Sequence, residues 1–496
     1  MLTRLLLLLG SAAGGTLMWA AFDPVDIGFL AFPALAILAL CVKNQPMWFG
    51  FMAGTLWGLA FFLPLVEWTW TAVGEPLPWL ALCVSQALFI GVVGAIWSRV
   101  LTLKVVPAVL LGGFAYAGVE VIRTNWPFNG FPWGMVAFSQ VDTPLLRSAP
   151  YLAAVGVTLL TVMLSLLLAL GIYQLFFESR IGGLALILSG PLVIALCLTL
   201  SLPVRAEETL RVGWVQGGPD VGKHNEGRAL NVTLRHEEET MRLLEQGPEL
   251  DLIVWPESAS DRDVRQTPQA QEIVERVSTE AGVPLLLGTQ EYVDDGRYND
   301  YTVWVDGELI DTYSKSRPVP FGEYIPLRDF FSNFTDAVDQ VSTDMLPGEG
   351  PATVTVPVAG VEHVLAVPIC FEIAVDDVVR DAVMAGGTAL IVPVNSASFG
   401  DSAESRQQMA QTQFRAAEFS RAALQVSTIG VSGVVMPNGT VTDMSNNGEA
   451  ASGVATIPLR TDLTSAATNG SIYRVGAILG ALLSLVWAFA LRKERS

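Results

Sequence analysis

The chain has few cysteines, few histidines and few charged residues for its length. Among 496 residues there are 4 cysteines and 3 histidines, and Asp, Glu, Lys and Arg together make up 16%, against about 25% in an ordinary soluble domain. Cys41, Cys83 and Cys197 lie in strongly apolar segments, which leaves Cys370 alone in the rest of the chain. We therefore expect no disulfide in the polar part. Because no Cys/His cluster has metal-ligand spacing, we also expect no zinc or iron centre and no other cofactor.

Positive charge is scarce as well. The chain has 29 Lys+Arg against 48 Asp+Glu, a formal net charge of −19, and much of the acidity lies in residues 207–470. Such a surface repels polyanions, so we expect no nucleic-acid partner. The chain is nevertheless 51% hydrophobic. A composition of this kind is typical of a protein that is partly embedded in a membrane and partly soluble.

Long apolar runs fill the first 205 residues and recur once near the C-terminus. Each is near the ~20 residues that a helix needs to cross a bilayer core. The first run has a charged start and small residues, as a signal peptide has, but further runs follow at once and favour a retained helix. We predict eight transmembrane helices, at residues 4–21, 27–42, 47–66, 77–98, 105–122, 150–177, 181–203 and 472–491.

Basic residues in the short loops predict the orientation of these helices. They fall at alternate ends of the spans, whereas the intervening loops carry acidic residues; the basic positions are Arg4, Lys43, Arg99, Lys104, Arg180 and residues 492–495. By the positive-inside rule both termini are cytoplasmic. We therefore predict a seven-helix membrane domain at residues 1–205, an extracytoplasmic domain at 206–470, and a last span with a short basic tail at 471–496.

The loop at residues 123–149 is rich in proline, glycine and aromatic residues, including Trp126 and Trp133. It fits either an aromatic belt at the membrane interface or one wall of a lipid-binding groove. Glu120, near the outer end of a span, either pairs with Arg123 or faces a polar cavity.

Residues 207–470 alternate between strand-like and helical patterns. Runs of Val, Ile and Leu predict strands at 210–216, 252–255, 284–289, 301–305, 364–369, 389–394, 424–428 and 431–435. Helical stretches lie at 226–245, 268–281, 376–386 and 404–422. Continuous apolar strands separated by helices indicate a layered α/β domain.

Three segments at predicted strand exits carry residues suited to acyl transfer. Glu257 follows an apolar strand, Lys315 stands in a loop with a second glutamate, Glu323, and Cys370 precedes Phe371 and Glu372. A carboxylate can take a thiol proton, and an ammonium stabilises both a thiolate and an oxyanion. Each residue alone is commonly a surface, solvated or core residue, but their joint occurrence predicts a catalytic site.

A Cys-His dyad is the alternative arrangement for an activated thiol. None of the three histidines, His224, His236 and His363, lies in a stretch with the composition of a catalytic loop. We therefore favour the Glu, Lys and Cys combination.

These motifs resemble a known family. Trp255-Pro-Glu257-Ser, Tyr313-Ser-Lys315 and Val367-Pro-Ile-Cys370-Phe-Glu372 are similar to the motifs of the nitrilase (carbon-nitrogen hydrolase) superfamily. Lys315-Ser-Arg-Pro-Val-Pro-Phe-Gly-Glu323-Tyr-Ile-Pro, Gly130-Phe-Pro-Trp-Gly and the helical layout narrow the resemblance to bacterial apolipoprotein N-acyltransferases (Lnt). Departures from the family pattern are Phe371, Ser398, Gln425, Thr428 and the absence of a clear aromatic residue in the 217–228 loop.

The resemblance implies an α-β-β-α sandwich attached to a multi-pass helical bundle in the bacterial cytoplasmic membrane. It implies that Cys370 is the nucleophile, Glu257 the general base and acid, and Lys315 the oxyanion stabiliser, with Glu323 and Glu372 as supporting carboxylates. The backbone N–H of Phe371 would be a second oxyanion donor. The expected substrates are a phospholipid acyl donor and a diacylglyceryl-modified lipoprotein acceptor.

Two other functions are compatible with parts of the sequence. A membrane-tethered amidase could use the same three residues on a small soluble substrate, which leaves the eight spans without a catalytic purpose. A transporter or receptor with an outer binding domain is a further alternative, but the spans offer few intramembrane charges of the kind that transport pathways use.

Overall fold

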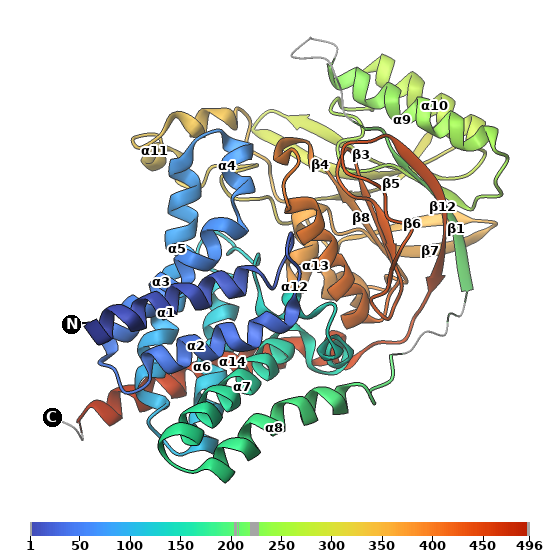
Figure 1. The fold of residues 1–496 in the computed structure, drawn as a ribbon. Helices are drawn as coiled ribbons and strands as arrows, with labels where there is room; N and C mark the ends of the chain where they lie inside the picture. Colours follow the sequence, from blue (N-terminus) through green and yellow to red (C-terminus); the bar gives the residue numbers. More distant parts are fainter. Residues whose placement is uncertain (1, 203–205, 207, 219–227, 494–496) are drawn as a thin grey trace. The chain divides into compact units, whose positions relative to one another are not determined.

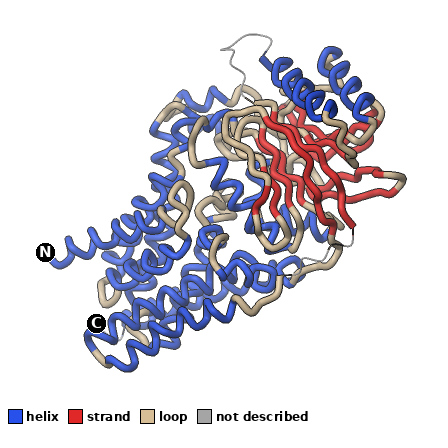
Figure 2. Tube along the Cα trace, turned by 45° about the vertical axis from the view of Figure 1, so that its right-hand side comes forward, coloured by secondary structure: helices blue, strands red, loops and turns tan. Residues whose placement is uncertain are grey.

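The computed structural model describes residues 2–202, 206, 208–218 and 228–493. It divides into two compact units, one formed by residues 1–201 with 468–496 and the other by residues 202–467. Figures 1 and 2 show that strands occur in the second unit and that the first is helical.

The first unit is built from apolar helices. They are α1 (Leu2–Trp19), α2 (Ala31–Val42), α3 (Met47–Leu65), α4 (Trp68–Val73), α5 (Pro76–Val100), α6 (Val105–Arg123), α7 (Ala149–Phe177), α8 (Arg180–Cys197) and α14 (Ser465–Lys493). Within the described residues, 7 helices are long and apolar enough to cross a membrane. The predicted multi-pass bundle is therefore confirmed. The second predicted span corresponds to a shorter apolar helix, Gly28–Val42.

Glycines allow α3 and α5 to pack backbone to backbone. A Cβ on Gly94 would lie 2.2 Å from the carbonyl oxygen of Gly50, and one on Gly54 would lie 2.4 Å from the carbonyl oxygen of Ile90. Small residues at helical spacing are the usual means of close approach between membrane helices.

Glu120 and Arg123 hold the loop after α6. Arg123 is buried, and its Nη1 donates to Gln86 Oε1 and to the carbonyl oxygens of Phe131 and Trp133 at 2.9–3.0 Å. Glu120 accepts hydrogen bonds from Val136 N at 3.0 Å and Thr158 Oγ1 at 2.7 Å, and it lies 4.0 Å from Arg123. The pairing alternative for Glu120 is thus the one observed. Of the loop tryptophans, Trp126 is exposed and Trp133 is buried.

The second unit contains two six-stranded sheets. Their strand orders are β12-β1-β2-β3-β4-β5 and β11-β10-β9-β8-β7-β6. The first sheet comprises β1 (Glu208–Gln216), β2 (Leu252–Val254), β3 (Leu285–Val293), β4 (Gly296–Val305), β5 (Glu308–Ser314) and β12 (Ala451–Leu459). The second comprises β6 (Thr353–Val358), β7 (Val361–Ala366), β8 (Leu390–Val394), β9 (Ala423–Ser427), β10 (Gly433–Val435) and β11 (Val441–Thr442).

Helices cover the outer faces of both sheets. α9 (Arg228–Glu245) and α10 (Pro268–Ala281) contact the first sheet, and α12 (Asp376–Met384) and α13 (Glu404–Phe419) contact the second (Figure 1). This is the predicted α-β-β-α sandwich. Trp255, Ile273, Val277 and Leu287 belong to the buried core between α10 and the first sheet.

The parallel strands lie at the centre of each sheet. β2 pairs in parallel with β1 and β3, and β8 pairs in parallel with β7 and β9. Parallel neighbours end at the same edge of a sheet, so the segments after β7 and β8 leave the second sheet at the same end. The segment after β2 meets the one after β8, where Asn395 N donates to Glu257.

One predicted strand is displaced by three residues, because β7 runs over Val361–Ala366. Residues 364–369 were expected to form a strand that ends next to Cys370, but β7 ends at Ala366. Pro368 has no N–H to donate to a neighbouring strand, and the chain turns into a short 3-10 helix, η5 (Cys370–Ala374).

Candidate active site

Glu257 lies three residues beyond the end of β2 and is fixed by tight backbone packing. The following residue, Ser258, has a positive φ of 49°. Gly288 on β3 lies against this turn, and a Cβ there would be 2.6 Å from Ser258 N and 2.7 Å from Glu257 Cα. Only glycine permits that approach. The position of Glu257 therefore depends on a residue of the neighbouring strand.

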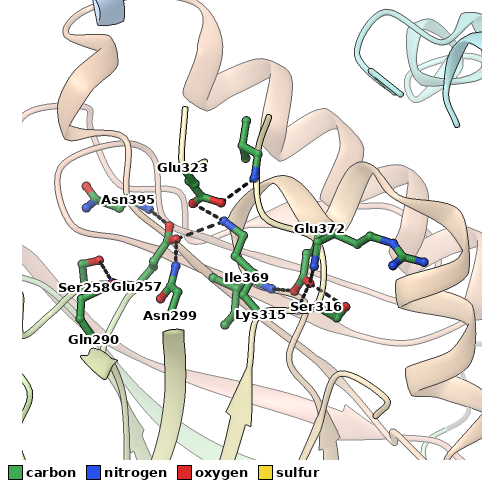
Figure 3. A network of polar contacts seen from close by, with 12 residues as sticks. Glu257, Ser258, Gln290, Asn299, Lys315, Ser316, Glu323, Ile369, Glu372 and Asn395 are labelled. Atoms are coloured by element: carbon green, nitrogen blue, oxygen red, sulfur yellow. Dashed lines mark hydrogen bonds and ion pairs between the residues drawn. The ribbon is translucent and has the colours of Figure 1, made fainter. Parts of the chain in front are cut away.

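Polar groups from two other segments hold the carboxylate of Glu257. Asn299 Nδ2, on β4, donates to Oε1 at 2.7 Å, and the backbone N–H of Asn395, after β8, donates to Oε2 at 2.8 Å. Lys315 Nζ lies 3.5 Å from Oε1. Figure 3 shows these groups converging on the carboxylate. Burial raises the pKa of Glu257, Lys315 lowers it, and the nearby Glu323 raises it further, with a net rise.

Lys315 is the first residue after β5, and its side chain is fully buried. Its backbone N–H donates to the carbonyl oxygen of Asn299 at 2.8 Å. Its Nζ donates to Glu323 Oε1 at 2.6 Å, and Glu323 Oε2 accepts from Val319 N at 2.7 Å. Burial by itself would lower the pKa of Lys315, but the carboxylates of Glu323 and Glu257 outweigh it and raise that pKa. The lysine is therefore a fixed positive charge.

Cys370 is the first residue of η5 and has a strained backbone. Its φ is +51°, a value that residues other than glycine rarely adopt. Residues with such strained backbone angles cluster at functional sites. The residue is partly exposed to solvent. The charges of Glu257 and Lys315 both act on its thiol. Burial of the thiol and then the charge of Glu257 raise the pKa of Cys370, so it rests as a thiol and needs a base to become a nucleophile.

Glu372 ties the cysteine segment to the lysine segment. Its carboxylate accepts from the backbone N–H groups of Ile369, Ser316 and Arg317 at 2.8–2.9 Å. The hydroxyl of Tyr313 donates to the same carboxylate at 2.9 Å. Figure 3 shows Glu372 between Ile369 and Ser316. Since Ser316 follows Lys315 and Ile369 precedes Cys370, these bonds join the lysine segment to the cysteine segment. The side chain of Phe371, between Cys370 and Glu372, is buried.

The structure thus brings Glu257, Lys315 and Glu323 into direct contact, and Glu372 joins the segment of Cys370 and Phe371 to that of Lys315. Two residues that hold Glu257, Asn299 and Asn395, were not predicted as site residues. Asn395 directly follows the apolar run of β8, and a polar residue at such a strand exit could have been predicted as a site residue. Asn299 lies inside β4 among other polar residues, and no pattern in the sequence distinguishes it.

Two of the departures from the family pattern make defined contacts. Thr428 Oγ1 donates to Asn395 Oδ1 at 3.0 Å and so supports the residue that holds Glu257. Gln425 is buried, accepts from Thr412 Oγ1 at 2.7 Å and donates to the carbonyl oxygen of Val431 at 2.9 Å. Most of the 217–228 loop lies outside the described residues.

Histidine takes no part in the described site. His236 is buried against Trp255, with ring centroids 5.5 Å apart, and burial lowers its pKa to about 4. His363 lies within β7. His224 lies outside the described residues. Among the residues that the structure describes, no group of three or more His, Cys, Asp or Glu side chains could hold a metal ion.

Comparison with known proteins agrees with this geometry. Residues 211–467 match the carbon-nitrogen hydrolase family, and residues 14–167 match the apolipoprotein N-acyltransferase N-terminal domain. The fold and the match over the second unit define a carbon-nitrogen hydrolase domain, joined here to a multi-pass helical unit.

Curated relatives show to which family of carbon-nitrogen hydrolases the chain belongs. A protein named apolipoprotein N-acyltransferase from Mycolicibacterium smegmatis is 30% identical, over 96% of this chain and 84% of the relative. A protein of the same name from Brucella melitensis is 30% identical over 87% of this chain and 85% of the relative. One from Gloeobacter violaceus is 29% identical over 88% of this chain and 85% of the relative. The chain belongs to the apolipoprotein N-acyltransferase family.

Solved structures similar to the chain include smaller proteins of the nitrilase superfamily. An amidase from Nesterenkonia sp. is 17% identical, with a TM-score of 0.39 over 52% of this chain and 93% of its own. A branch 10 member from Saccharomyces cerevisiae has the same identity, coverage and TM-score.

Proposed function

We propose that the chain is an N-acyltransferase that moves a fatty acyl chain from a membrane phospholipid to the N-terminal α-amine of a diacylglyceryl-cysteine in apolipoproteins. The observation that supports the proposal is the 3.5 Å contact between Lys315 and Glu257, two charged groups that both act on the Cys370 thiol. Membership of the family supports it, as do apolar helices suited to holding a lipid substrate in the bilayer.

The first half-reaction forms a thioester on Cys370. Glu257 takes the thiol proton while the sulfur attacks the carbonyl carbon of a phospholipid ester. Lys315 and the backbone N–H of Phe371 stabilise the oxyanion of the tetrahedral intermediate. The C–O bond then breaks, and Glu257 returns the proton to the oxygen of the departing lysophospholipid.

The second half-reaction transfers the acyl chain to nitrogen. The acceptor amine attacks the thioester carbon, the C–S bond breaks, and the sulfur recovers a proton through Glu257. A thioester is converted to an amide in a downhill step, so no nucleotide is required. A water-poor site would slow the competing hydrolysis of the thioester.

We further propose the topology that the loop charges predict. The helices of the first unit lie in the bacterial cytoplasmic membrane, both termini are cytoplasmic, and residues 206–470 form the catalytic domain on the outer side. Residues 494–496 of the basic tail lie outside the described residues. A membrane-tethered amidase is the weaker alternative, because residues 14–167 match the N-terminal domain of apolipoprotein N-acyltransferases.

Intact-mass analysis of the purified full chain tests the proposal. Incubation with a diacyl phospholipid is expected to add the mass of one fatty acyl chain and to release lysophospholipid. Addition of a synthetic diacylglyceryl-cysteine peptide should then remove that mass and yield an N-acylated peptide. Cys370→Ser should give no adduct that transfers to the peptide. A wild-type protein that hydrolyses small amides but never carries an acyl chain would point to the amidase alternative.

A further inference from the structure

One face of α13 carries buried polar groups that have no hydrogen-bond partner in the described part of the chain. These groups are Glu404 Oε2, both side-chain amide atoms of Gln408, and Gln411 Oε1. All three side chains are at most 4% exposed. A buried polar atom left unpaired costs about 1–3 kcal/mol, so such a row calls for a specific explanation. Positions 404, 408 and 411 recur at helical spacing, which places them on one face.

This face of α13 lies beside the cysteine segment. Arg415 continues the row, and its guanidinium donates to the carbonyl oxygens of Ile373 and Ala374 in η5 at 3.1 and 2.9 Å. At the other end of the row, the carboxyl group of Glu404 interacts electrostatically with Cys370 and Glu257. The row therefore runs along η5, with Glu404 at the end nearest the thiol.

A different face of α13 makes the structural contacts with the second sheet. Ser405 Oγ accepts from Val431 N at 2.7 Å, and Thr412 Oγ1 donates to Gln425 Oε1 at 2.7 Å. Ser405 and Thr412, the polar side chains of α13 that face the sheet, thus each have a hydrogen-bond partner there. The unpaired row is not needed for that packing.

Glu404 has no counter-ion among the described residues. Burial, and to a smaller extent the charge of Glu257, raise its pKa to about 8. The hydroxyl of Ser396 is near enough to favour the anion, but the two groups make no hydrogen bond of ordinary geometry. The titratable groups that act on Glu404 are Glu257, from the segment after β2, and Cys370, from η5. A cation would find an unpaired carboxyl group here.

In the second half-reaction the acceptor amine loses two protons, and Glu257 can transfer only one of them. An α-amine has a pKa of about 7.7–8.0 and arrives largely as an ammonium ion near neutral pH. It loses one proton to expose its lone pair and a second after nitrogen has bonded to the acyl carbon. Glu257 passes one of these protons to the leaving sulfur. The other needs a second acceptor, which a hydrolase that uses neutral water does not require.

We propose that Glu404 binds the α-ammonium of the lipoprotein acceptor and takes its first proton, with Gln408 and Gln411 supplying further polar contacts to the acceptor. This inference rests on the proposed function. In the balanced step, ammonium, thioester and Glu404 carboxylate become amide, Cys370 thiol and Glu404 carboxylic acid, which then releases its proton to water. The charge of the bound ammonium favours the ionised form of Glu404, so a carboxylate is present to take the proton.

The test separates the two half-reactions in Glu404→Gln. The full-length variant is loaded with acyl chain from phosphatidylglycerol in detergent, and the thioester is followed by intact mass. Loading is expected within about threefold of wild type. Transfer to a synthetic diacylglyceryl-cysteine peptide should slow by about 100-fold, within the usual range for general acid-base catalysis. Glu362→Gln, which removes an exposed carboxylate on β7, should change neither step.

A second acceptor distinguishes proton transfer from a structural defect. Hydroxylamine is uncharged at neutral pH, so its attack on the thioester should proceed in Glu404→Gln at nearly the wild-type rate. Equal slowing with both acceptors, or normal transfer to the peptide, would overturn the inference. If Glu404→Gln does not fold, Glu404→Asp is compared in the same way, and the same selective loss is expected. Failure of wild type to load or transfer would instead refute the proposed function itself.

Discussion

Replacing Lys315 with methionine tests the central charge of the site. The side chain of Lys315 is fully buried, with its Nζ 2.6 Å from Glu323 Oε1 and 3.5 Å from Glu257 Oε1. At an effective dielectric constant of about 20, these distances correspond to gross attractions of about 6 and about 5 kcal/mol. Methionine keeps much of the length and apolar volume but leaves the buried carboxylate of Glu257 and the partly buried carboxylate of Glu323 without their counter-ion.

Both the rate and the stability should respond to Lys315→Met. Loss of one oxyanion donor typically lowers a rate by about 10²–10³, and breaking a buried ion pair typically costs about 3–5 kcal/mol. For a domain of this size we expect a fall in melting temperature of about 10 °C. Acyl-enzyme formation is measured by an intact-mass time course and unfolding by a fluorescence melt. Arg211→Met is the matched control, because it breaks the exposed pair with Glu249, worth about 0–1 kcal/mol.

The pH dependence of the stability loss gives a further check. Without Lys315, which lowers the pKa of Glu257, the folded-state pKa of Glu257 should rise further above its unfolded value. A carboxyl group with a raised folded pKa contributes stability below its unfolded pKa and loses it as pH rises through the folded value. The stability gap between variant and wild type should therefore be widest near neutral pH and narrow toward about pH 4. Acylation within tenfold of wild type would refute the assigned role of Lys315.

Two further predictions concern the neighbours of Lys315. Asn299→Leu removes a hydrogen-bond donor 2.7 Å from Glu257 Oε1, and loss of that donor should raise the pKa of Glu257. The acidic limb of the plot of acylation rate against pH should therefore move to higher pH. An unshifted limb would contradict the role of Asn299. Glu257→Gln removes a negative charge that raises the pKa of Cys370, so iodoacetamide should alkylate Cys370 faster than in wild type at pH 7 while phospholipid acylation is lost. Slower alkylation in that variant would show that Glu257 activates the resting thiol instead of serving only during attack.

The sequence predicted the centre of each sheet and missed its edges. All eight predicted strands are present, and the four that were missed, β5, β6, β11 and β12, are the outermost strands of the two sheets. Central strands are buried on both faces and appear as continuous apolar runs. An edge strand such as β6 alternates between buried and half-buried residues, and β5 is mostly exposed, so neither forms such a run.

The sequence allowed us to predict the site residues that directly follow a strand-like run and carry a reactive or charged side chain. Glu257, Lys315 and Cys370 each follow an apolar run and carry a side chain with an evident chemical use. Asn299 lies within a strand, Asn395 in the loop after β8 and Glu404 on a helix, all places where polar residues are common. Their significance depends on which atoms they face, and local sequence does not contain that information.

Composition and hydropathy alone determined that the chain combines apolar helices with an α/β domain, because burial of continuous apolar segments is a local property of the residues. The motifs determined which three residues to consider together. Tertiary structure decided how Glu257 is held by Asn299 and Asn395 and how Glu372 joins the lysine and cysteine segments. It also decided that Glu404 Oε2 is buried without a hydrogen-bond partner in the described part of the chain. Those contacts join residues as far apart as 257 and 395, and only the folded sheets bring them within hydrogen-bonding distance.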